Sequence, residues 1–251
     1  MDNAPLSVFQ RSLAVDEAGK RDVSMPAEQG ETEQARTTPA DPCGLSFCDF
    51  SALPVATHPF KRVLDVAIAG FALLLFLPLL LMVMAAIRME TPGSSIFRQR
   101  RTGYRGRVFT IYKFRTMTVT EDCADLRQAT KNDSRVTGIG ALLRKLSIDE
   151  LPQLWNVLKG DMSIVGPRPH ALAHDEYYGA LIPTYAARFR AKPGLTGYAQ
   201  VNGFRGEIRD AGGMNDRVAA DNHYIEEWSP AMDIAILIRT VPLVFKDPRA
   251  Y

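Results

Sequence analysis

The sequence is poor in cysteine: of 251 residues only Cys43, Cys48 and Cys123 are cysteines, and their spacings are unrelated. This excludes a disulfide framework and a zinc site built from four cysteines. The sequence also lacks a compositional extreme, since 23% of its residues are charged, 46% are hydrophobic and its net charge is +2. These averages exclude a wholly disordered chain, a collagen-like fibre and a protein with many membrane spans. The length allows one domain with a substantial core.

The first 57 residues lack the apolar spacing of either a helix or a strand. Residues 1–60 contain four Lys and Arg against nine Asp and Glu, whereas residues 61–251 contain 26 against 19. A segment with so few apolar residues buries too little surface to offset the entropy of ordering, so we predict a disordered acidic tail over residues 1–57. It has no basic start followed by an apolar stretch, and no cleavable signal peptide is predicted. The basic remainder suggests an anionic partner.

A long apolar run follows the tail. From Val63 to Ile87 only Asp65 is charged. As a helix this run reaches ~37 Å, more than the ~30 Å of a bilayer's hydrocarbon core. A buried core helix is the alternative, but the run lacks an amphipathic period. We therefore predict a membrane-associated helix over residues 58–90.

Pro78 divides this run into arms of roughly 22 and 14 Å, neither of which crosses a bilayer alone. A proline-kinked span remains open, because such helices do cross membranes. Basic residues flank both ends, which favours two ends on the cytoplasmic side; they are Lys61, Arg62, Arg88, Arg98, Arg100, Arg101, Arg105 and Arg107. We predict a re-entrant helix–break–helix that enters one leaflet, with Pro78 at the break.

The remainder, residues 91–251, is soluble in character and predicts an α+β fold that is mainly helical. Residues 96–97 and 108–117 have the β-branched and aromatic content of strands, and Gly103 and Gly106 supply a turn between them. Helices are predicted near residues 121–130, 139–146, 149–158, 171–188, 215–228 and 232–245. The expected architecture is a small β-hairpin and a compact helical domain, with amphipathic helices at the membrane interface.

Asp149 and Glu150 are the first candidate site. Ser147 to Glu150 matches a capping box, and acids are favoured in the first turn of a helix, so a purely structural role is a good explanation. The same pair beside Arg144 also suits a metal ion held against a phosphate. The helix end would then keep Asp149 ionised, as a nucleophile or magnesium ligand must be.

Arg168 stands between Pro167 and Pro169, which fix the backbone on both sides. Its guanidinium is thereby presented for a bidentate grip on phosphate, although the segment is equally a rigid turn. The basic run over residues 98–115 includes Lys113 and contains no acid. It is either a solvated charged face or a contact for anionic headgroups or a phosphorylated lipid. Nucleic acid is not expected, because no groove-binding motif is present.

Three weaker patterns remain. His170 and His174 are four residues apart, which on a helix would suit a metal site completed by Asp175. Residues 192–200 form a glycine- and proline-containing loop, either a connector or a loop whose backbone approaches a nucleotide. Arg217 and Asp221 are spaced for an ion pair along a helix.

The order of the motifs resembles one known family. Lys61-Arg62 with Asp65, the proline-broken run, YKFRTM (112–117), LRKLSIDELPQLWNVLKGDMS (143–163), VGPRPH (165–170), KPGLTG (192–197) and DNHYIEEWS (221–229) are similar to bacterial sugar transferases. These are the monotopic polyprenyl-phosphate phosphoglycosyl transferases, and the resemblance covers residues 59–251. It implies that residues 91–251 form a cytoplasmic catalytic domain at the inner membrane. Relatives often have Ser-Pro at the membrane break, where this chain has Leu77-Pro78.

The resemblance implies a two-step reaction that uses Mg²⁺. Asp149 would attack the β-phosphate of a nucleotide-diphosphate sugar, and undecaprenyl phosphate would then displace the sugar phosphate from Asp149. Glu150 would assist with the metal or the acceptor, so both acids are candidate metal ligands. The implied phosphate and substrate residues are Lys113, Arg115, Arg144, Arg168, Arg217 and Asp221. The implied nucleotide loop contains Pro193, Gly194, Gly197 and Gln200.

Within the family, HALAHDEYY (170–178) and GYAQVNGFRGE (197–207) resemble the exopolysaccharide initiators that use UDP-glucose. UDP-galactose and an N-acetylhexosamine donor remain alternatives. Two other classes also stay open, a membrane-anchored scaffold without turnover and a hydrolase of lipid phosphates. The expected partners are the nucleotide sugar, undecaprenyl phosphate and the bilayer, and a homodimer is left open.

Overall fold

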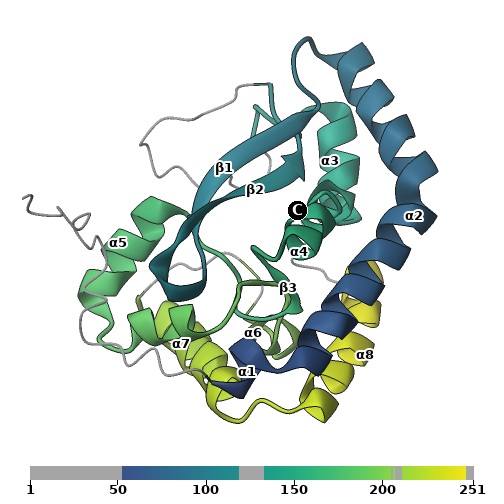
Figure 1. The fold of residues 1–251 in the computed structure, drawn as a ribbon. Coiled ribbons are helices and arrows are strands. Elements are labelled where there is room, and N and C mark those ends of the chain that lie inside the picture. Colours follow the sequence, from purple (N-terminus) through teal and green to yellow (C-terminus); the bar gives the residue numbers. More distant parts are fainter. Residues whose placement is uncertain (1–52, 119–132, 205, 207–210, 247–251) are drawn as a thin grey trace, which may run out of the picture. The chain divides into compact units, whose positions relative to one another are not determined.

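The computed structural model describes residues 53–118, 133–204, 206 and 211–246. The chain divides into two units, Met1–Pro39 and Ala40–Tyr251, and every described residue lies in the second. Its elements are α1 (Pro54–Thr57), α2 (Pro59–Glu90), β1 (Ile96–Thr102), η2 (Tyr104–Gly106), β2 (Val108–Phe114), α3 (Gly138–Lys145), η3 (Ile148–Glu150), α4 (Gln153–Lys159), β3 (Ser163–Val165), α5 (Leu172–Leu181), η4 (Tyr185–Arg190), β4 (Gly194–Thr196), α6 (Tyr198–Val201), α7 (Ala211–Glu226) and α8 (Pro230–Lys246). The mainly helical α+β prediction is confirmed (Figure 1).

The predicted membrane helix is α2, which runs for 32 residues without interruption. Pro59 stands in its first turn, where a missing N–H costs nothing. Pro78 lies inside the helix, and α2 changes direction along its length while it stays helical (Figure 1). Proline removes one backbone donor and presses on the preceding turn, which bends a helix without having to end it. The expected break between two helices is therefore a bend within one helix.

α2 packs against the rest of the unit near both of its ends, whereas residues 74–78 in its middle are exposed on all sides. Its buried residues recur at helical spacing, and they are Lys61, Asp65, Ala69, Leu80, Val83 and Ile87. Large exposed apolar side chains occupy much of the remaining surface, among them Val63, Phe71, Leu74 and Met82. Among the described residues α2 is the one helix long and apolar enough to cross a membrane, and only 17% of its most apolar stretch is buried. The core-helix alternative is thereby excluded.

The predicted hairpin forms from β1 and β2, which pair antiparallel from Ile96 opposite Phe114 to Thr102 opposite Val108. The turn passes through Arg105 and Gly106, whose φ angles of 56° and 72° are left-handed. Glycine adopts such angles without steric cost, which explains its presence in the turn. The first strand is longer than predicted, because arginines fill it and hide its alternation of buried and exposed positions.

A parallel pair of short strands, β3 and β4, is absent from the sequence prediction. Ser163 lies opposite Gly194, and Val165 lies opposite Thr196. The pair joins the VGPRPH and KPGLTG motifs. Gly166 N–H donates to Thr196 O at 2.9 Å. A Cβ on Gly194 would come within 2.1 Å of the Gly166 nitrogen, so only glycine permits this approach.

Three helices agree closely with the predicted ranges, namely α3, α7 and α8. The helix predicted over 171–188 divides into α5 and η4 at Ile182 and Pro183, since proline cannot continue the hydrogen-bond ladder. The helix predicted over 149–158 divides into η3 and α4. The one predicted over 121–130 lies outside the described residues.

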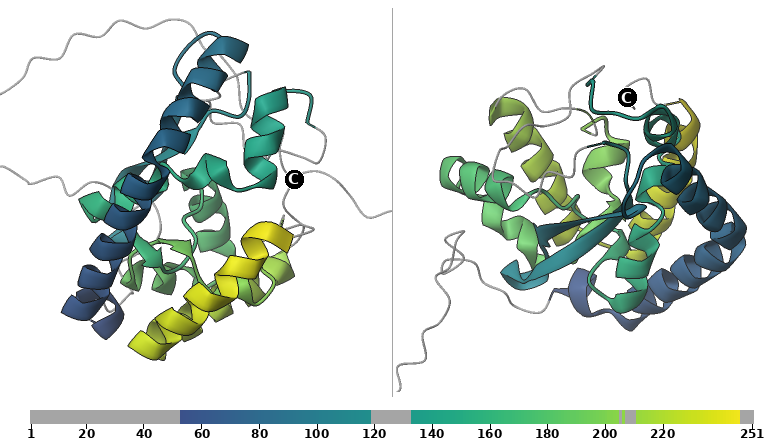
Figure 2. Two further views of the ribbon diagram at one scale, coloured as in Figure 1. Left: turned by 90° about the vertical axis from the view of Figure 1, so that its right-hand side faces the viewer. Right: turned by 90° about the horizontal axis from the view of Figure 1, so that it is seen from above.

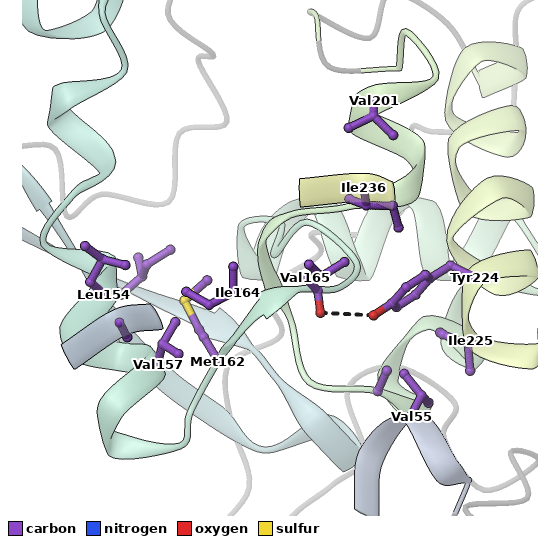
Figure 3. Close-up of a cluster of buried hydrophobic side chains, with 13 residues drawn as sticks. Val55, Leu154, Val157, Met162, Ile164, Val165, Val201, Tyr224, Ile225 and Ile236 are labelled. Atoms are coloured by element: carbon purple, nitrogen blue, oxygen red, sulfur yellow. Dashed lines mark hydrogen bonds between the residues drawn. The ribbon is translucent and has the colours of Figure 1, made fainter. Parts of the chain in front are cut away.

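The tail was predicted to extend to Thr57, but α1 lies inside that range. Val55 is buried in the main core cluster, and Leu53 packs against it. The prediction is therefore wrong for residues 54–57, where a short amphipathic turn was mistaken for tail. Figure 3 shows Val55 beside Ile225 in this core, which also includes residues of α2, α4, β3 and α8. The rest of the predicted tail lies outside the described residues.

The beginnings of α2 and α8 lie side by side (Figure 2, left). Lys61 Nζ is 2.8 Å from Asp233 Oδ2, and this buried ion pair joins the first turns of the two helices. Arg62 donates from its two terminal nitrogens to the carbonyls of Val157 and Leu158 at 2.7 and 2.8 Å, and so caps the end of α4. The sequence predicts that both cations flank a membrane segment, but in the structure they bond to protein groups.

Candidate active site

Asp149 and Glu150 lie in η3, a single turn between α3 and α4. Ser147 enters this turn with a left-handed φ of 55°, and its side chain does not cap the turn. A non-glycine residue in this conformation costs roughly 1–3 kcal/mol and is typical of functional sites. The predicted capping box is therefore wrong: the backbone turns at Ser147, and the Glu150 carboxylate binds two cations instead of the preceding backbone.

Glu150 is held by cations from two other parts of the fold. Lys113 of β2 donates from Nζ to Oε1 at 2.9 Å. Arg168, in the loop after β3, donates from Nη2 to the same oxygen at 2.6 Å and from Nη1 to Oε2 at 3.4 Å. The two-pronged contact fixes the plane of the guanidinium against the carboxylate. The structure thus brings together three sequence-predicted residues, two of which are 37 and 18 positions from Glu150.

The two acids differ in their ionisation. Burial and the neighbouring Glu150 carboxylate raise the pKa of Asp149 to about 6, and the nearby cations offset this only partly. Burial also opposes the ionisation of Glu150, but Arg168 and Lys113 outweigh it and hold its pKa well below the usual range. The prediction that a helix end keeps Asp149 ionised is wrong in its cause. Asp149 is a carboxylate at neutral pH although its surroundings disfavour the charge, a combination common in catalytic groups.

The Asp149 carboxylate makes no hydrogen bond or ion pair within the described ranges. Arg144 is close enough to lower its pKa, while the Arg144 Nε itself donates to Thr116 Oγ1 at 3.0 Å. Asp149 therefore has oxygen lone pairs available to a reacting atom or a cation. Glu150 differs, because its Oε1 is already shared between Lys113 and Arg168.

Magnesium usually takes one or two protein carboxylates and completes its shell with water and substrate phosphates. Asp149 fits this pattern as a single free carboxylate. Glu150 fits less well, because two cations already bind its Oε1. Within the parts of the chain that the structure describes, no three His, Cys, Asp or Glu side chains form a metal cluster. A magnesium ion held by Asp149 would therefore need further oxygen ligands from water and substrate.

Arg115 was predicted to bind phosphate, but its guanidinium holds the end of α2. Its Nη1 donates to Pro92 O at 2.6 Å, and its Nη2 donates to Thr91 O at 2.7 Å and Thr91 Oγ1 at 2.8 Å. Carbonyls at the end of a helix lack intrahelical partners, and a cation satisfies them well. Arg115 therefore has a structural role in positioning the chain between α2 and β1.

Arg217 and Asp221 do not form the predicted ion pair. Asp221 accepts from Arg188 Nε at 2.9 Å, and all three residues are buried. Arg217 donates from Nη2 to Gly206 O at 2.8 Å. Burial, Arg168 and Arg188 lower the pKa of Arg217 to about 10, so it lies near Arg168 and remains a cation. Asp221 is thus a support for Arg188, whereas Arg217 stays close to the site.

The predicted nucleotide loop packs against the Arg168 loop. Cβ atoms on Gly194 and Gly197 would come within 2.1 and 2.2 Å of backbone atoms of Gly166. Pro193 O accepts from Ser163 N–H at 2.8 Å, and Gln200 is buried with its Nε2 donating to Leu195 O at 3.3 Å. The two glycines therefore permit close approach of two protein backbones, as expected of a connector, and a contact between this loop and a nucleotide stays a prediction.

His170 and His174 do not share a helix, because α5 begins at Leu172. His170 Nδ1 is 2.7 Å from Tyr185 Oη and 2.9 Å from Arg188 Nη1. Burial and the nearby arginines lower the pKa of His170 well below its usual range, so the ring is neutral. Tyr185 Oη donates to Asp175 Oδ1 at 2.7 Å. These side chains form a hydrogen-bond network in place of the metal site considered from the sequence.

Apolar residues surround the acidic pair on the side of α2. Ile148 and Leu151, which flank the two acids, pack on a cluster that contains Leu80 and Val83 of α2. Exposed apolar side chains continue on α3, directly after it and on α4, namely Leu142, Leu146 and Trp155. The basic run has two sides: Arg98, Arg100, Arg105 and Arg107 are exposed, whereas Arg101 and Arg115 are not. Asp149 and Glu150 therefore lie beside the apolar surface to which α2 contributes.

A family model described as bacterial sugar transferase matches residues 56–247. The chain belongs to this family. Over 197 residues it is 54% identical to the UDP-glucose:undecaprenyl-phosphate glucose-1-phosphate transferase of Caulobacter vibrioides. The matched region is 78% of this chain and 74% of the relative. The Escherichia coli protein of the same name is 49% identical, over 76% of this chain and 41% of the relative. The UDP-N-acetylgalactosamine-undecaprenyl-phosphate N-acetylgalactosaminephosphotransferase of Aeromonas hydrophila is 40% identical, over 76% and 45%.

This bacterial sugar transferase thus spans about three quarters of the Caulobacter relative and less than half of the other two. Two arginines near the site were not assigned to it from the sequence: Arg188 was not singled out, and Arg101 was named only as part of the basic run. Arg188 donates to the backbone carbonyl of Arg168. Arg101 is close enough to Arg168 and Glu150 for both to affect the pKa of Arg101, which burial and Arg168 lower to about 10. Alternation along a strand could have predicted the position of Arg101, because it places this side chain on the face of β1 opposite the exposed Arg98 and Arg100. Arg188 carried no such signal, because it stands in a short turn.

Proposed function

We propose that this protein transfers a hexose 1-phosphate, glucose 1-phosphate from UDP-glucose, to undecaprenyl phosphate and releases UMP. One observation carries the proposal. A carboxylate without a protein partner among the described residues, Asp149, stands beside an acid clamped by Lys113 and Arg168, at the edge of an exposed apolar helix. A transfer between a water-soluble anion and a lipid phosphate needs these two surroundings at one place.

In the proposed first step an oxygen of Asp149 attacks the β-phosphorus of the nucleotide sugar. The bond from that phosphorus to the bridging oxygen breaks, and UMP leaves with the electron pair. In the second step a phosphate oxygen of undecaprenyl phosphate attacks the same phosphorus and releases Asp149 as a carboxylate. Arg168, Lys113 and Arg144 supply the positive charge that such a transfer between anions requires.

Magnesium is part of this proposal. When bound, it would neutralise charge on the transferring phosphate, and the free carboxylate of Asp149 would hold it together with substrate oxygens. The contribution of the chain itself is orientation. Glu150 keeps Lys113 and Arg168 at fixed positions, and the left-handed turn at Ser147 presents Asp149 outside the helix α4.

We further propose that α2 is a re-entrant, monotopic helix and that the catalytic domain lies on the cytoplasmic face of the inner membrane. Both ends of α2 bind the same unit, which supports this topology. At its start Asp65 Oδ1 accepts from Ser163 Oγ at 2.9 Å and from Ile164 N–H at 2.8 Å. At its end Glu90 Oε1 accepts from Ile139 N–H at 3.2 Å. A spanning helix would place these ends on opposite sides of the bilayer.

The sugar is proposed from the relatives. Four of them, at 46 to 54% identity, carry the UDP-glucose transferase name. The N-acetylgalactosamine enzyme at 40% identity makes an N-acetylhexosamine the second candidate. The proteins of Rhizobium leguminosarum and Rhizobium meliloti, named for exopolysaccharide production, support a role in the first membrane step of such a polymer.

The test is incubation of the purified full chain with undecaprenyl phosphate, Mg²⁺ and each of UDP-glucose, UDP-galactose, UDP-N-acetylglucosamine and UDP-N-acetylgalactosamine. UMP release with UDP-glucose and a lipid-linked product of the matching mass is the expected result. Sugar phosphate released without a lipid product would favour a hydrolase. An absence of turnover with every donor would favour a membrane scaffold.

A further inference from the structure

Arg188 is buried behind the acidic site with only 3% of its surface exposed, and its guanidinium contacts four groups. Nη2 donates to the backbone carbonyl of Arg168 at 2.6 Å. Nε donates to Asp221 Oδ2 at 2.9 Å. Nη1 lies 2.9 Å from His170 Nδ1 and 3.2 Å from Tyr185 Oη. One planar group therefore joins η4, α7 and the loop that carries Arg168.

The carbonyl of Arg168 belongs to the peptide bond that precedes Pro169. The loop is also tied on its other side, where Gly194 N–H donates to Pro167 O at 2.8 Å. Two prolines and two hydrogen bonds thus fix the backbone on either side of the Arg168 side chain. That side chain is the one that binds both oxygens of Glu150.

We propose that Arg188, held by Asp221, is a positioning residue that sets the Arg168 guanidinium on Glu150. The inference rests on the proposed function and adds to it a pair that touches no substrate. Its path runs from Asp221 through Arg188 to the Arg168 backbone, and from the Arg168 side chain to Glu150. Every link is a direct hydrogen bond between described residues.

The geometry requires arginine at position 188. A planar guanidinium offers five donors in fixed directions, so it can bond a carbonyl and a carboxylate at once. Lysine keeps the charge for Asp221 but has one nitrogen at the end of a flexible chain. The Arg188→Lys variant therefore retains the buried ion pair and loses the fixed contact to Arg168 O.

A double-mutant cycle tests the proposal, with kcat/KM for UDP-glucose measured in four proteins: wild type, Arg188→Lys, Arg168→Lys and the double variant. If Arg188 acts through Arg168, we expect Arg188→Lys to lower activity roughly 10- to 100-fold in wild type and less than about threefold in the Arg168→Lys background. Equal losses in both backgrounds would overturn the proposal, because a merely structural residue acts independently of Arg168. Arg190→Lys is the matched control, since Arg190 pairs with the exposed Glu226 and should change little.

Two additions keep the test decisive. If Arg188→Lys does not fold, as judged by its thermal transition, Asp221→Asn replaces it in the same cycle, because the amide keeps the shape and weakens the hold on Arg188. An activity-independent readout uses ¹⁵N-arginine labelling, with the Nε–H signal of Arg168 assigned by its loss in Arg168→Lys. We expect this signal to be rigid in wild type and mobile in Arg188→Lys, and equal rigidity in both would overturn the proposal. Since this signal needs no turnover, its outcome is separate from any failure of the proposed function.

Discussion

Lys61 Nζ lies 2.8 Å from Asp233 Oδ2 in the interior of the protein, and both side chains are almost fully buried. The same ammonium donates to Tyr224 Oη at 2.9 Å and to Val165 O at 3.0 Å, which uses all three of its hydrogens. Tyr224 in turn donates to Asp233 Oδ1 at 2.7 Å. The long apolar helix α2 therefore begins in a buried network of hydrogen bonds and charges.

Removal of one partner should reveal how strongly this network fixes α2. Asp233→Ala removes the carboxylate that is bonded to the buried Lys61 ammonium, and we expect a loss of roughly 3–5 kcal/mol in the free energy of unfolding. The measurement is denaturant unfolding of the purified protein in detergent. Lys159→Ala is the control, because Lys159 pairs with Asp161 at the surface and should cost no more than about 1 kcal/mol. Similar losses in both variants would contradict the role of the buried pair.

Asp149→Asn should abolish turnover and leave the fold intact, because the side chain keeps its volume and loses the charge of the nucleophile. In wild type incubated with UDP-glucose alone, mass spectrometry should detect a phosphohexose on the peptide that contains Asp149. Glu150→Gln is the informative comparison: it removes the clamp on Lys113 and Arg168 but keeps Asp149, so the adduct should form more slowly. Full activity of the Asn variant would exclude the covalent step.

The raised pKa of Asp149 predicts a stability cost in the metal-free protein. The folded value is about 6 and the unfolded value about 3.9, so the folded state binds this proton more tightly. Stability should then fall as pH rises from about 4 to 6 and stay lower above 6, by up to about 3 kcal/mol. Because other carboxyls titrate in the same range, the quantity to measure is wild type minus Asp149→Asn. A difference that does not change with pH would show that burial of Asp149 carries no such cost.

Much of the site could be predicted from the sequence because its polar residues stand in short, rigid motifs. Prolines on both sides of Arg168 and the Asp149-Glu150 pair are local features, and the structure places them together. What could not be predicted is which cation meets which anion. The partner of Asp221 proved to be Arg188, 33 positions away, instead of Arg217 one helical turn away. Such a choice depends on the packing of η4 against α7, which no local pattern encodes.

In the fold, too, features with a local sequence signal could be predicted and those that depend on tertiary contacts could not. The long apolar run and the hairpin have strong periodic or compositional signals, and both were found. The pair β3–β4 was missed because each strand has three residues, too few for an alternating pattern. The role of Lys61 and Arg62 was misjudged for another reason: basic residues beside an apolar run are usually exposed, and only tertiary contacts show that these two face the core.

The topology of α2 leads to a labelling experiment in intact cells. Single cysteines would replace the exposed Met89 at the end of α2 and the exposed Arg98 on β1, in a chain whose three native cysteines are serine. A third cysteine at position 50 reports on the segment before α2. We expect a membrane-impermeant maleimide to label none of them before the cells are opened, and all of them afterwards. Labelling at position 50 alone in intact cells would show that α2 spans the membrane.

The boundary of the tail gives the last prediction. Val55 is 2% exposed in the main core, so a chain without residues 2–57 loses this contact and that of Leu53. A chain without residues 2–52 keeps both contacts. Because the deleted part contains none of the site residues, the turnover of this chain in membranes should stay close to that of the full chain.

Val55→Ala in the full chain should cost about 1–3 kcal/mol in the free energy of unfolding, through lost burial and the cavity that remains. Val63→Ala is the matched control, since Val63 is 67% exposed on α2 and should change stability by less than about 0.5 kcal/mol. Loss of turnover in the stable 2–52 deletion would assign the tail a function, and equal stability of the two deletions would show that α1 contributes nothing to the core.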